Sequence, residues 1–166
     1  MTMKLRGRKK YYRNLINHEI PEWVDFDKTD IWFDFFHQHI DNKDIGNERW
    51  KSREQHLNAL FTLAEKYEIE LSKMNCDYQF WININERDSD DDAIYIHTKN
   101  PNKSEFPVKV KNYHNLKSKN ENLEKYIESK AYKIIRFPVY DENKSEMINY
   151  YLYKDGLGIS MDKNPA

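Results

Sequence analysis

A repeat of apolar residues at every second position, which begins at residue 78, constrains the fold more than any other feature. Between residues 78 and 84 one side of an extended chain receives only aromatic and aliphatic residues, namely Tyr78, Phe80, Ile82 and Ile84. A repeat of two residues is the signature of a β-strand with one buried face. An acidic turn at residues 87–92 follows, and residues 93–98 return as a second strand. The pattern therefore predicts an antiparallel hairpin, and with it a sheet that packs one face on other elements.

An amphipathic helix is predicted at about residues 48–72. Its apolar positions recur at helical spacing and are Trp50, Leu57, Leu60, Phe61, Ala64, Tyr67 and Leu71. Charged residues, Arg53 among them, are expected on the opposite side. A helix with one apolar face has to bury that face, and the sheet is the natural partner.

The remaining elements complete the predicted fold. We expect a helix that starts near Thr29 or Asp30 and ends at about Ile40, because apolar residues recur there at helical spacing. Further elements are predicted as a strand at 106–113, a helix at 119–130, and strands at 132–139 and 148–153. This order predicts an α+β fold, with an antiparallel sheet of about five strands on which two N-terminal helices and one inserted helix pack. We expect residues 1–14 to form a basic N-terminal arm and residues 15–166 to form a single α+β domain.

The charges of the chain are unevenly distributed. Lys and Arg total 27 against 28 Asp and Glu, and six of the bases fall within the first 13 residues, which contain no acid. The rest of the chain therefore carries 21 bases against 28 acids, which makes it acidic by seven charges. One cysteine, Cys76, cannot form an intramolecular disulfide, and no apolar run is long enough to span a bilayer. We expect a cytoplasmic protein that does not contact membranes.

No residue pattern predicts a catalytic or metal site. The alternating acids of residues 88–92 imitate the start of a calcium loop, but Ala93 and Lys99 stand where such a loop needs glycine and glutamate. His37 and His39 are two residues apart, so on a helix they would point in different directions instead of binding one zinc ion. We expect no cofactor, no metal and no enzymatic activity. A carboxylate or histidine site without a motif remains a third alternative.

Two segments have the composition of a binding surface. The first interleaves acids with aromatic rings, which anchor an interface while the charge steers a basic partner toward it. Its candidate partner-binding residues are Glu22, Trp23, Asp25, Asp27, Asp30, Trp32 and Asp34, and the turn residues Asp88, Asp90, Asp91 and Asp92 are expected to extend the same negative field. The second segment mixes bases with tyrosines, as nucleic-acid-binding arms do. Its candidate residues are Lys4, Arg6, Arg8, Lys9, Lys10 and Arg13.

The stretches IWFDFFHQHI at residues 31–40 and DDDAIYIHT at residues 90–98 lie in a chain that is acidic and rich in aromatic residues. In these respects the chain resembles the immunity proteins of bacterial toxin–immunity systems, including contact-dependent growth inhibition. The resemblance implies a non-catalytic inhibitor that binds a cognate protein toxin, commonly a nuclease, and blocks its basic active-site cleft. The basic arm departs from this pattern and leaves open which face would bind. The alternative is a nucleic-acid-binding accessory or phage protein that uses the arm, and the sequence does not fix the oligomeric state.

Overall fold

The computed structural model describes residues 31–35, 47–73, 79–86, 92–97, 111–140 and 146–154, together with residues 10, 13, 14, 16, 17 and 19. At residues 31–35, 47–49, 52, 79 and 97 it describes the backbone alone. The elements with described bounds are the helices α2 (Asn47–Ser72) and α3 (Glu121–Glu128) and the strands β1 (Ile31–Phe35), β2 (Gln79–Asn85), β3 (Asp92–His97), β4 (Lys133–Tyr140) and β5 (Glu146–Tyr153). The α+β class predicted from the sequence is confirmed.

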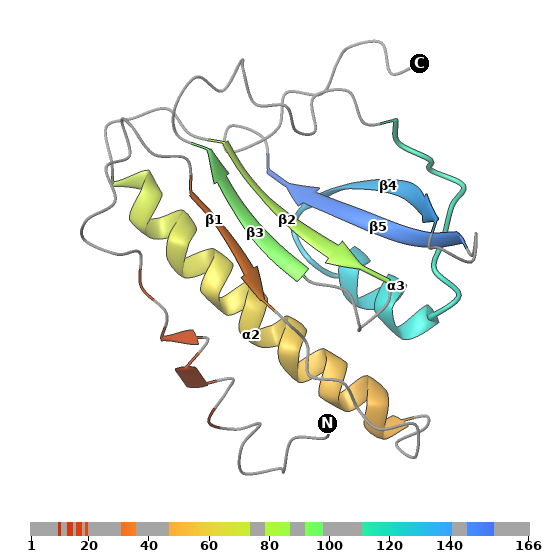
Figure 1. The fold of residues 1–166 in the computed structure, drawn as a ribbon, viewed down its shortest axis with the longest axis horizontal. Coiled ribbons are helices and arrows are strands. Elements are labelled where there is room, and N and C mark those ends of the chain that lie inside the picture. The colour runs from red at the N-terminus through yellow and green to blue at the C-terminus, as the bar shows by residue number, and fades with distance from the viewer. Residues whose placement is uncertain are drawn as a thin grey trace.

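The strands of the described residues form one antiparallel sheet in the order β1-β3-β2-β5-β4 (Figure 1). The predicted hairpin is confirmed, because β2 and β3 pair from Gln79 opposite His97 to Asn83 opposite Ala93. Strand β1 pairs with the other side of β3, from Ile31 opposite Ile96 to Phe35 opposite Asp92. Among the described strands, β1 and β4 are therefore the two outer ones.

The main core lies between one face of the sheet and the two helices. Helix α2 was predicted within one residue of its bounds, and its apolar side is fully buried at Leu57, Leu60, Leu63, Ala64, Tyr67 and Leu71. Helix α3 adds Leu123 and Ile127 to the same cluster. The sheet contributes alternate residues, including Phe80, Ile82, Ile84, Ile94, Ile96, Tyr150 and Leu152. Each such side chain contributes about 1.5–3 kcal/mol when it leaves water, so this layer supplies most of the drive to fold.

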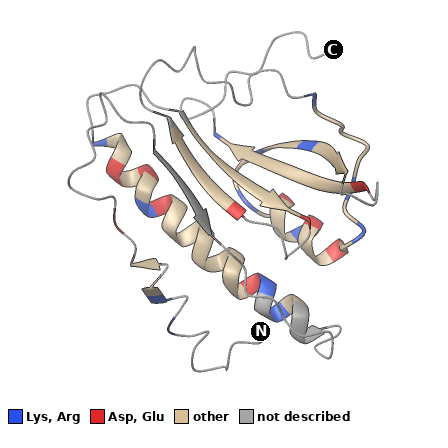
Figure 2. Ribbon diagram, in the orientation of Figure 1, with Lys and Arg blue, Asp and Glu red and all other residues tan. Residues whose placement is uncertain are grey.

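The opposite face of the sheet carries a second buried cluster. It is made of Trp81, Ile135, Tyr151 and Tyr153, with the partly buried Tyr95 and Phe137 packed against it. Trp81 stacks on Tyr95 with ring centroids 5.1 Å apart, and Phe137 lies against Tyr151 at 4.4 Å. The central strands carry almost no charged residues, whereas the acids and bases of α2 lie toward its two ends (Figure 2). Each face of the sheet therefore carries a buried apolar cluster.

Two predicted elements are wrong. Residues 31–35 of the predicted helix at about 30–40 form strand β1, and residues 36–40 lie outside the described part of the chain. The apolar residues Ile31, Phe33 and Phe35 also recur with a period of two, and pairing with β3 selects that period. In the predicted strand at 106–113, residues 111–113 are not a strand and residues 106–110 are not described. Of the three predicted helices, α2 and α3 are present, and β1 is a strand that was not predicted. Among the described residues of the N-terminal segment, residues 10, 13, 14 and 16 are also helical.

Candidate functional site

Strand β1 holds two of the predicted partner-binding residues, Trp32 and Asp34. Their backbones pair with Tyr95 and Ala93 of β3, and β1 is the outermost strand on this side of the sheet. Most of the other predicted partner-binding residues lie outside the described part of the chain, namely Glu22, Trp23, Asp25, Asp27, Asp30, Asp88, Asp90 and Asp91. The structure therefore places Trp32 and Asp34 on an outer edge.

One hydrogen bond between the end of β2 and β5 shows toward which neighbouring strand the backbone N–H and carbonyl of each residue point. The Glu86 N–H donates to the Ile148 carbonyl at 2.9 Å, so the even-numbered residues of β2 direct their backbone groups toward β5. In an antiparallel ladder successive residues alternate between the two neighbouring strands. The odd-numbered residues of β2, such as Trp81, therefore turn toward β3, where Trp81 pairs with Tyr95.

The same alternation fixes the direction of the groups in β1. Even-numbered residues of β3 turn away from β2 and toward β1, and there Ile94 pairs with Phe33. Odd-numbered residues of β1 thus bond to β3, which leaves the N–H and carbonyl groups of Trp32 and Asp34 directed outward. Within the described residues, no segment pairs with this outer edge.

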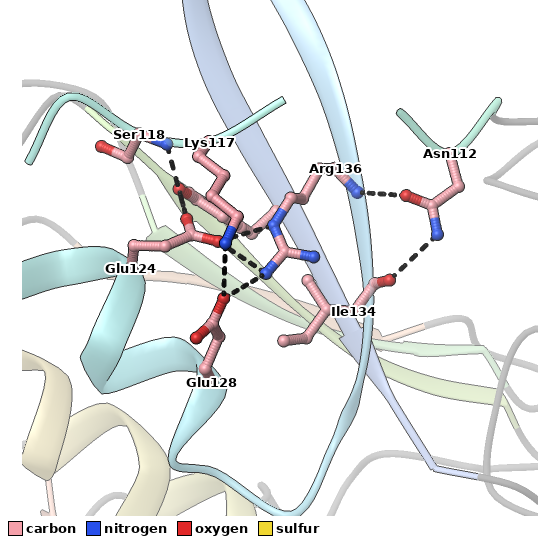
Figure 3. A network of polar contacts seen from close by, with 8 residues as sticks. Asn112, Lys117, Ser118, Glu124, Glu128, Ile134 and Arg136 are labelled. Carbon is pink, nitrogen blue, oxygen red and sulfur yellow. Dashed lines mark hydrogen bonds and ion pairs between the residues drawn. The ribbon is translucent and has the colours of Figure 1, made fainter. Parts of the chain in front are cut away.

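The opposite edge of the sheet, at β4, is closed. The Asn112 amide donates to the Ile134 carbonyl at 3.2 Å and accepts from the Arg136 N–H at 3.1 Å (Figure 3). The Tyr113 N–H donates to the Arg136 carbonyl at 2.8 Å. The next outward position is Pro138, which has no N–H to offer. A side chain, a backbone amide and a proline therefore occupy or remove four of the outward backbone groups that an added strand would need, namely the Ile134 carbonyl, both groups of Arg136 and the N–H at position 138.

An ionic network holds helix α3 beside this closed edge (Figure 3). The buried Glu124 carboxylate accepts from Arg136 Nε at 2.7 Å and from the Tyr150 hydroxyl at 2.5 Å. Arg136 also reaches Glu128 at 3.2 Å, so one guanidinium joins two turns of α3 to β4. Burial, together with the hydrogen bond to Glu124, raises the pKa of Tyr150 above its ordinary value. Tyr150 therefore stays protonated and acts as a hydrogen-bond donor.

Glu86, just after β2, ties the segment before α3 to the centre of the sheet. One carboxylate oxygen accepts from the Ser118 hydroxyl at 2.8 Å and from the Lys119 N–H at 3.1 Å. The other oxygen accepts from the Ile148 N–H at 2.8 Å. Through Glu86, the segment before α3 is therefore connected both to the end of β2 and to β5.

Asp92 is the one predicted partner-binding residue that the structure contradicts. Its side chain is 0% exposed at the start of β3, beneath helix α2. Both of its oxygens are hydrogen-bonded by Arg53, and His56 Nε2 lies 3.1 Å from Oδ2. The Asn85 N–H donates to Oδ1 at 3.1 Å, and Arg53 also donates to the Asn85 carbonyl at 2.8 Å. Asp92 therefore joins α2 to the sheet and cannot contact a partner.

The charge state of Asp92 follows from these contacts. Burial alone would raise its pKa, but the charge of Arg53 and the hydrogen bonds from His56 and Arg53 outweigh burial and hold the pKa at about 2. The sequence placed Arg53 on the polar side of the helix, which is wrong, because Arg53 is only 3% exposed. Arg53 lies four residues before Leu57 and His56 four before Leu60, and this helical spacing to apolar residues was the signal that both share the buried side.

The acidic sequences before β1 and before β3 join the sheet at different places. The chain enters β1 at Ile31, which pairs with Ile96, and enters β3 at Asp92, which pairs with Phe35. The acidic sequences that precede the two strands therefore join the sheet at opposite ends of the β1–β3 pair, about 13 Å apart along the strands. Residues 22–30 and 88–91 lie outside the described part of the chain, so the prediction that residues 88–92 extend the field of residues 22–34 is contradicted only at the buried Asp92 and otherwise stays a prediction.

The basic arm is described at a few positions only. The side chains of Lys10 and Arg13 are exposed, and the Asn17 N–H donates to the Arg13 carbonyl at 3.1 Å. The other predicted nucleic-acid-binding residues, Lys4, Arg6, Arg8 and Lys9, lie outside the described residues.

The described ranges hold neither a metal-binding cluster nor a membrane-spanning helix. There, no three side chains of the His, Cys, Asp and Glu types gather as a metal site would require. His37, His39 and Cys76 lie outside those ranges. Among the described helices, none has the length and apolar character needed to cross a membrane.

Comparison with known proteins gives no relative. The chain matches no protein-family model, no curated protein and no solved structure. The functional proposal below therefore rests on the chain's own sequence and geometry.

Proposed function

We propose that this chain is a non-catalytic immunity protein that binds and neutralises a cognate protein toxin of the nuclease class. The observation that supports this function most directly is the position of Trp32 and Asp34 on the outermost strand of the sheet. Both residues belong to the acidic, aromatic-rich segment that the sequence singles out. An outer strand is a place where a second protein can reach the sheet.

The charge of the same segment favours a basic partner. Residues 22–34 contain five acids against the single base Lys28, a net charge of −4. A nuclease cleft is basic because it has to hold phosphates. Complementary charge raises the association rate and suppresses binding to acidic proteins.

The first test is neutralisation in cells. Tagged full-length protein is purified from its source cell at low and high salt, and the protein partner that remains bound is then expressed with and without the chain. We expect a stoichiometric partner whose toxicity disappears on co-expression. A partner that stays toxic in the presence of the chain would contradict the proposal.

The second test concerns the acidic segment. The triple variant Asp25→Lys, Asp27→Lys, Asp30→Lys is expected to associate with the toxin at least tenfold more slowly, and with a weaker dependence on salt, because steering by charge is lost. The matched control reverses three exposed acids elsewhere, Glu65, Glu121 and Glu146. Stopped-flow association at several salt concentrations measures both. Equal slowing in the two triple variants would mean that net charge alone matters.

Exposed bases in the arm keep nucleic-acid binding as the second candidate. Lys10 and Arg13 both present their side chains to solvent. Deleting residues 1–13 separates the two candidates, because only nucleic-acid binding should weaken in proportion to the phosphate contacts removed.

A further inference from the structure

We propose that residues 111–119, which we call the basic strip, form a binding surface for single-stranded nucleic acid. The outward residues of the basic strip are all exposed and are Lys111, Tyr113, Asn115, Lys117 and Lys119. None of them belongs to the two binding segments predicted from the sequence. The proposal goes beyond the proposed function, because it requires neither a toxin nor the acidic segment.

The inner side of the basic strip is attached to the sheet and to the main core. The Asn112 side chain is hydrogen-bonded to two residues of β4 (Figure 3). Leu116 packs against the core cluster beneath α2 and α3, and the Ser118 hydroxyl donates to Glu86 at 2.8 Å. These attachments hold the backbone before any ligand arrives, so binding costs little ordering of the protein.

The charge of this part of the chain favours an anionic polymer. Residues 111–120 contain three lysines and no acid, and residues 111–140 contain seven bases against three acids. The rest of the chain therefore holds 20 of the 27 bases and 25 of the 28 acids. Arg136 pairs with two of the three acids in this part, Glu124 at 2.6 Å and Glu128 at 3.2 Å, and so offsets their charge. The positive field that remains attracts anions.

The rings beside the lysines favour nucleic acid over an acidic polypeptide. The Tyr113 side chain is 40% exposed, and Lys111 Nζ lies 5.0 Å from the centroid of its ring. The exposed His114 follows in the sequence. An aromatic ring next to a cation can stack on a base while the cation holds a phosphate. Because the base has to be unpaired to stack in this way, the basic strip fits a single strand better than a duplex.

Two variants of the full-length protein test the two parts of the proposal. The strip pair, Lys111→Gln with Lys119→Gln, removes two charges from the basic strip and leaves its inner attachments in place. Tyr113→Ala removes the ring and keeps every lysine. Both changes are at exposed side chains, and circular dichroism checks that the variants fold.

Two control pairs remove the same number of charges elsewhere. Lys51→Gln with Lys73→Gln changes exposed lysines near the two ends of α2. Lys10→Gln with Arg13→Gln changes exposed bases of the N-terminal arm. The controls separate the basic strip from a general effect of charge and from binding by the arm.

Affinity is measured by fluorescence anisotropy with labelled single-stranded DNA of about 12 nucleotides, at several salt concentrations. We expect the strip pair to bind about tenfold more weakly at low salt than the wild type, and with a shallower salt dependence, because phosphate contacts are lost. Tyr113→Ala should also bind about tenfold more weakly, but with the salt dependence of the wild type, because stacking is lost instead of charge. Each control pair should stay within about twofold of the wild type.

A measurement on the wild type alone locates the bound strand. On addition of the same DNA, the NMR resonances of the Tyr113 and Asn115 amides should shift, whereas those of Lys51 and Lys73 should not. Unchanged resonances across residues 111–119 would overturn the basic strip as the binding surface even where the protein binds DNA.

The other outcomes are equally decisive. A wild type that binds no single-stranded DNA, an equal loss in all three pairs, or a loss confined to the arm pair overturns the proposal. Equal affinity for polyglutamate overturns nucleic acid in favour of an acidic polypeptide, and equal affinity for a duplex of the same length overturns the single strand. None of these measurements involves toxin neutralisation, so the proposed function stands or falls separately.

Discussion

At the scale of single residues, Asp92 shows how an acid in an acidic turn sequence can belong to the core. Its carboxylate holds a buried arginine and a buried histidine, and all three lie between α2 and the sheet. Neither sequence spacing nor charge pattern could distinguish Asp92 from Asp90 and Asp91, because its burial depends on Arg53, 39 residues away along the chain. Long-range pairing of this kind is what sequence reading misses at this site.

Removing the Asp92 charge should destabilise the fold strongly. In Asp92→Asn the buried Arg53 guanidinium loses its counter-charge, so we expect the free energy of unfolding to fall by about 3 kcal/mol or more. Urea unfolding followed by circular dichroism measures the change. Glu121→Gln, at an exposed acid of α3, serves as control and should change stability by less than about 0.5 kcal/mol. A loss of similar size in both variants would contradict the role of Asp92.

Low pH should lower the free energy of unfolding, because Asp92 becomes protonated. The folded-state pKa of Asp92 is about 2 and the ordinary value is 3.8, so its contribution is complete above the ordinary value and disappears as the pH falls from 3.8 toward 2. The expected loss is about 2 kcal/mol. Comparing urea midpoints of the wild type and Asp92→Asn at pH 7, 4 and 2.5 isolates this contribution. The two proteins should converge in stability at low pH, and a constant difference would show that Asp92 does not titrate there.

At the scale of elements, the long and regular patterns predicted structure and the short ones did not. The helix predicted at 48–72 is α2, and the strands predicted at 132–139 and 148–153 are β4 and β5 within two residues at each end. The short segment at 31–35 fits both a helical and a strand repeat, and pairing with β3 decided between them. Residues 111–113 lie beside β4 but are not a strand. The Asn112 side chain makes the hydrogen bonds to Ile134 and Arg136 that the backbone of a neighbouring strand would make.

Asn112 is expected to keep the β4 edge closed. Asn112→Ala frees the Arg136 N–H and the Ile134 carbonyl, so we expect a stability loss of about 1 kcal/mol and faster hydrogen exchange at the Arg136 amide. The exposed Asn115 lies in the same segment, and Asn115→Ala provides the control. Amide exchange followed by NMR gives the residue-level readout. Unchanged exchange at Arg136 would mean that another group shields this edge.

At the scale of the whole molecule, one sheet carries an apolar cluster on each of its two faces. Trp81 faces one cluster while its neighbours Phe80 and Ile82 face the other, so the two clusters share the backbone of β2. The sequence alternation predicted the helix-facing side correctly. It could not show that Trp81, on the other side, is also buried.

The shared strands should make unfolding a single transition. In a variant whose only tryptophan is Trp81, with Trp23, Trp32 and Trp50 changed to Phe, fluorescence reports the second cluster and circular dichroism at 222 nm reports the helices. We expect the two urea transitions to coincide, because neither cluster can separate while β2, β3 and β5 remain paired. Two distinct midpoints would show that the clusters unfold independently.

The closed edge at β4 also limits how copies of this protein can assemble. Continuous stacking of molecules into a filament requires each sheet to offer two joining edges, one for the copy before and one for the copy after. Here Asn112, Tyr113 and Pro138 terminate one of them. A second copy that approaches β4 therefore finds too few free backbone groups to pair with, so the sheet does not extend through this edge into a filament.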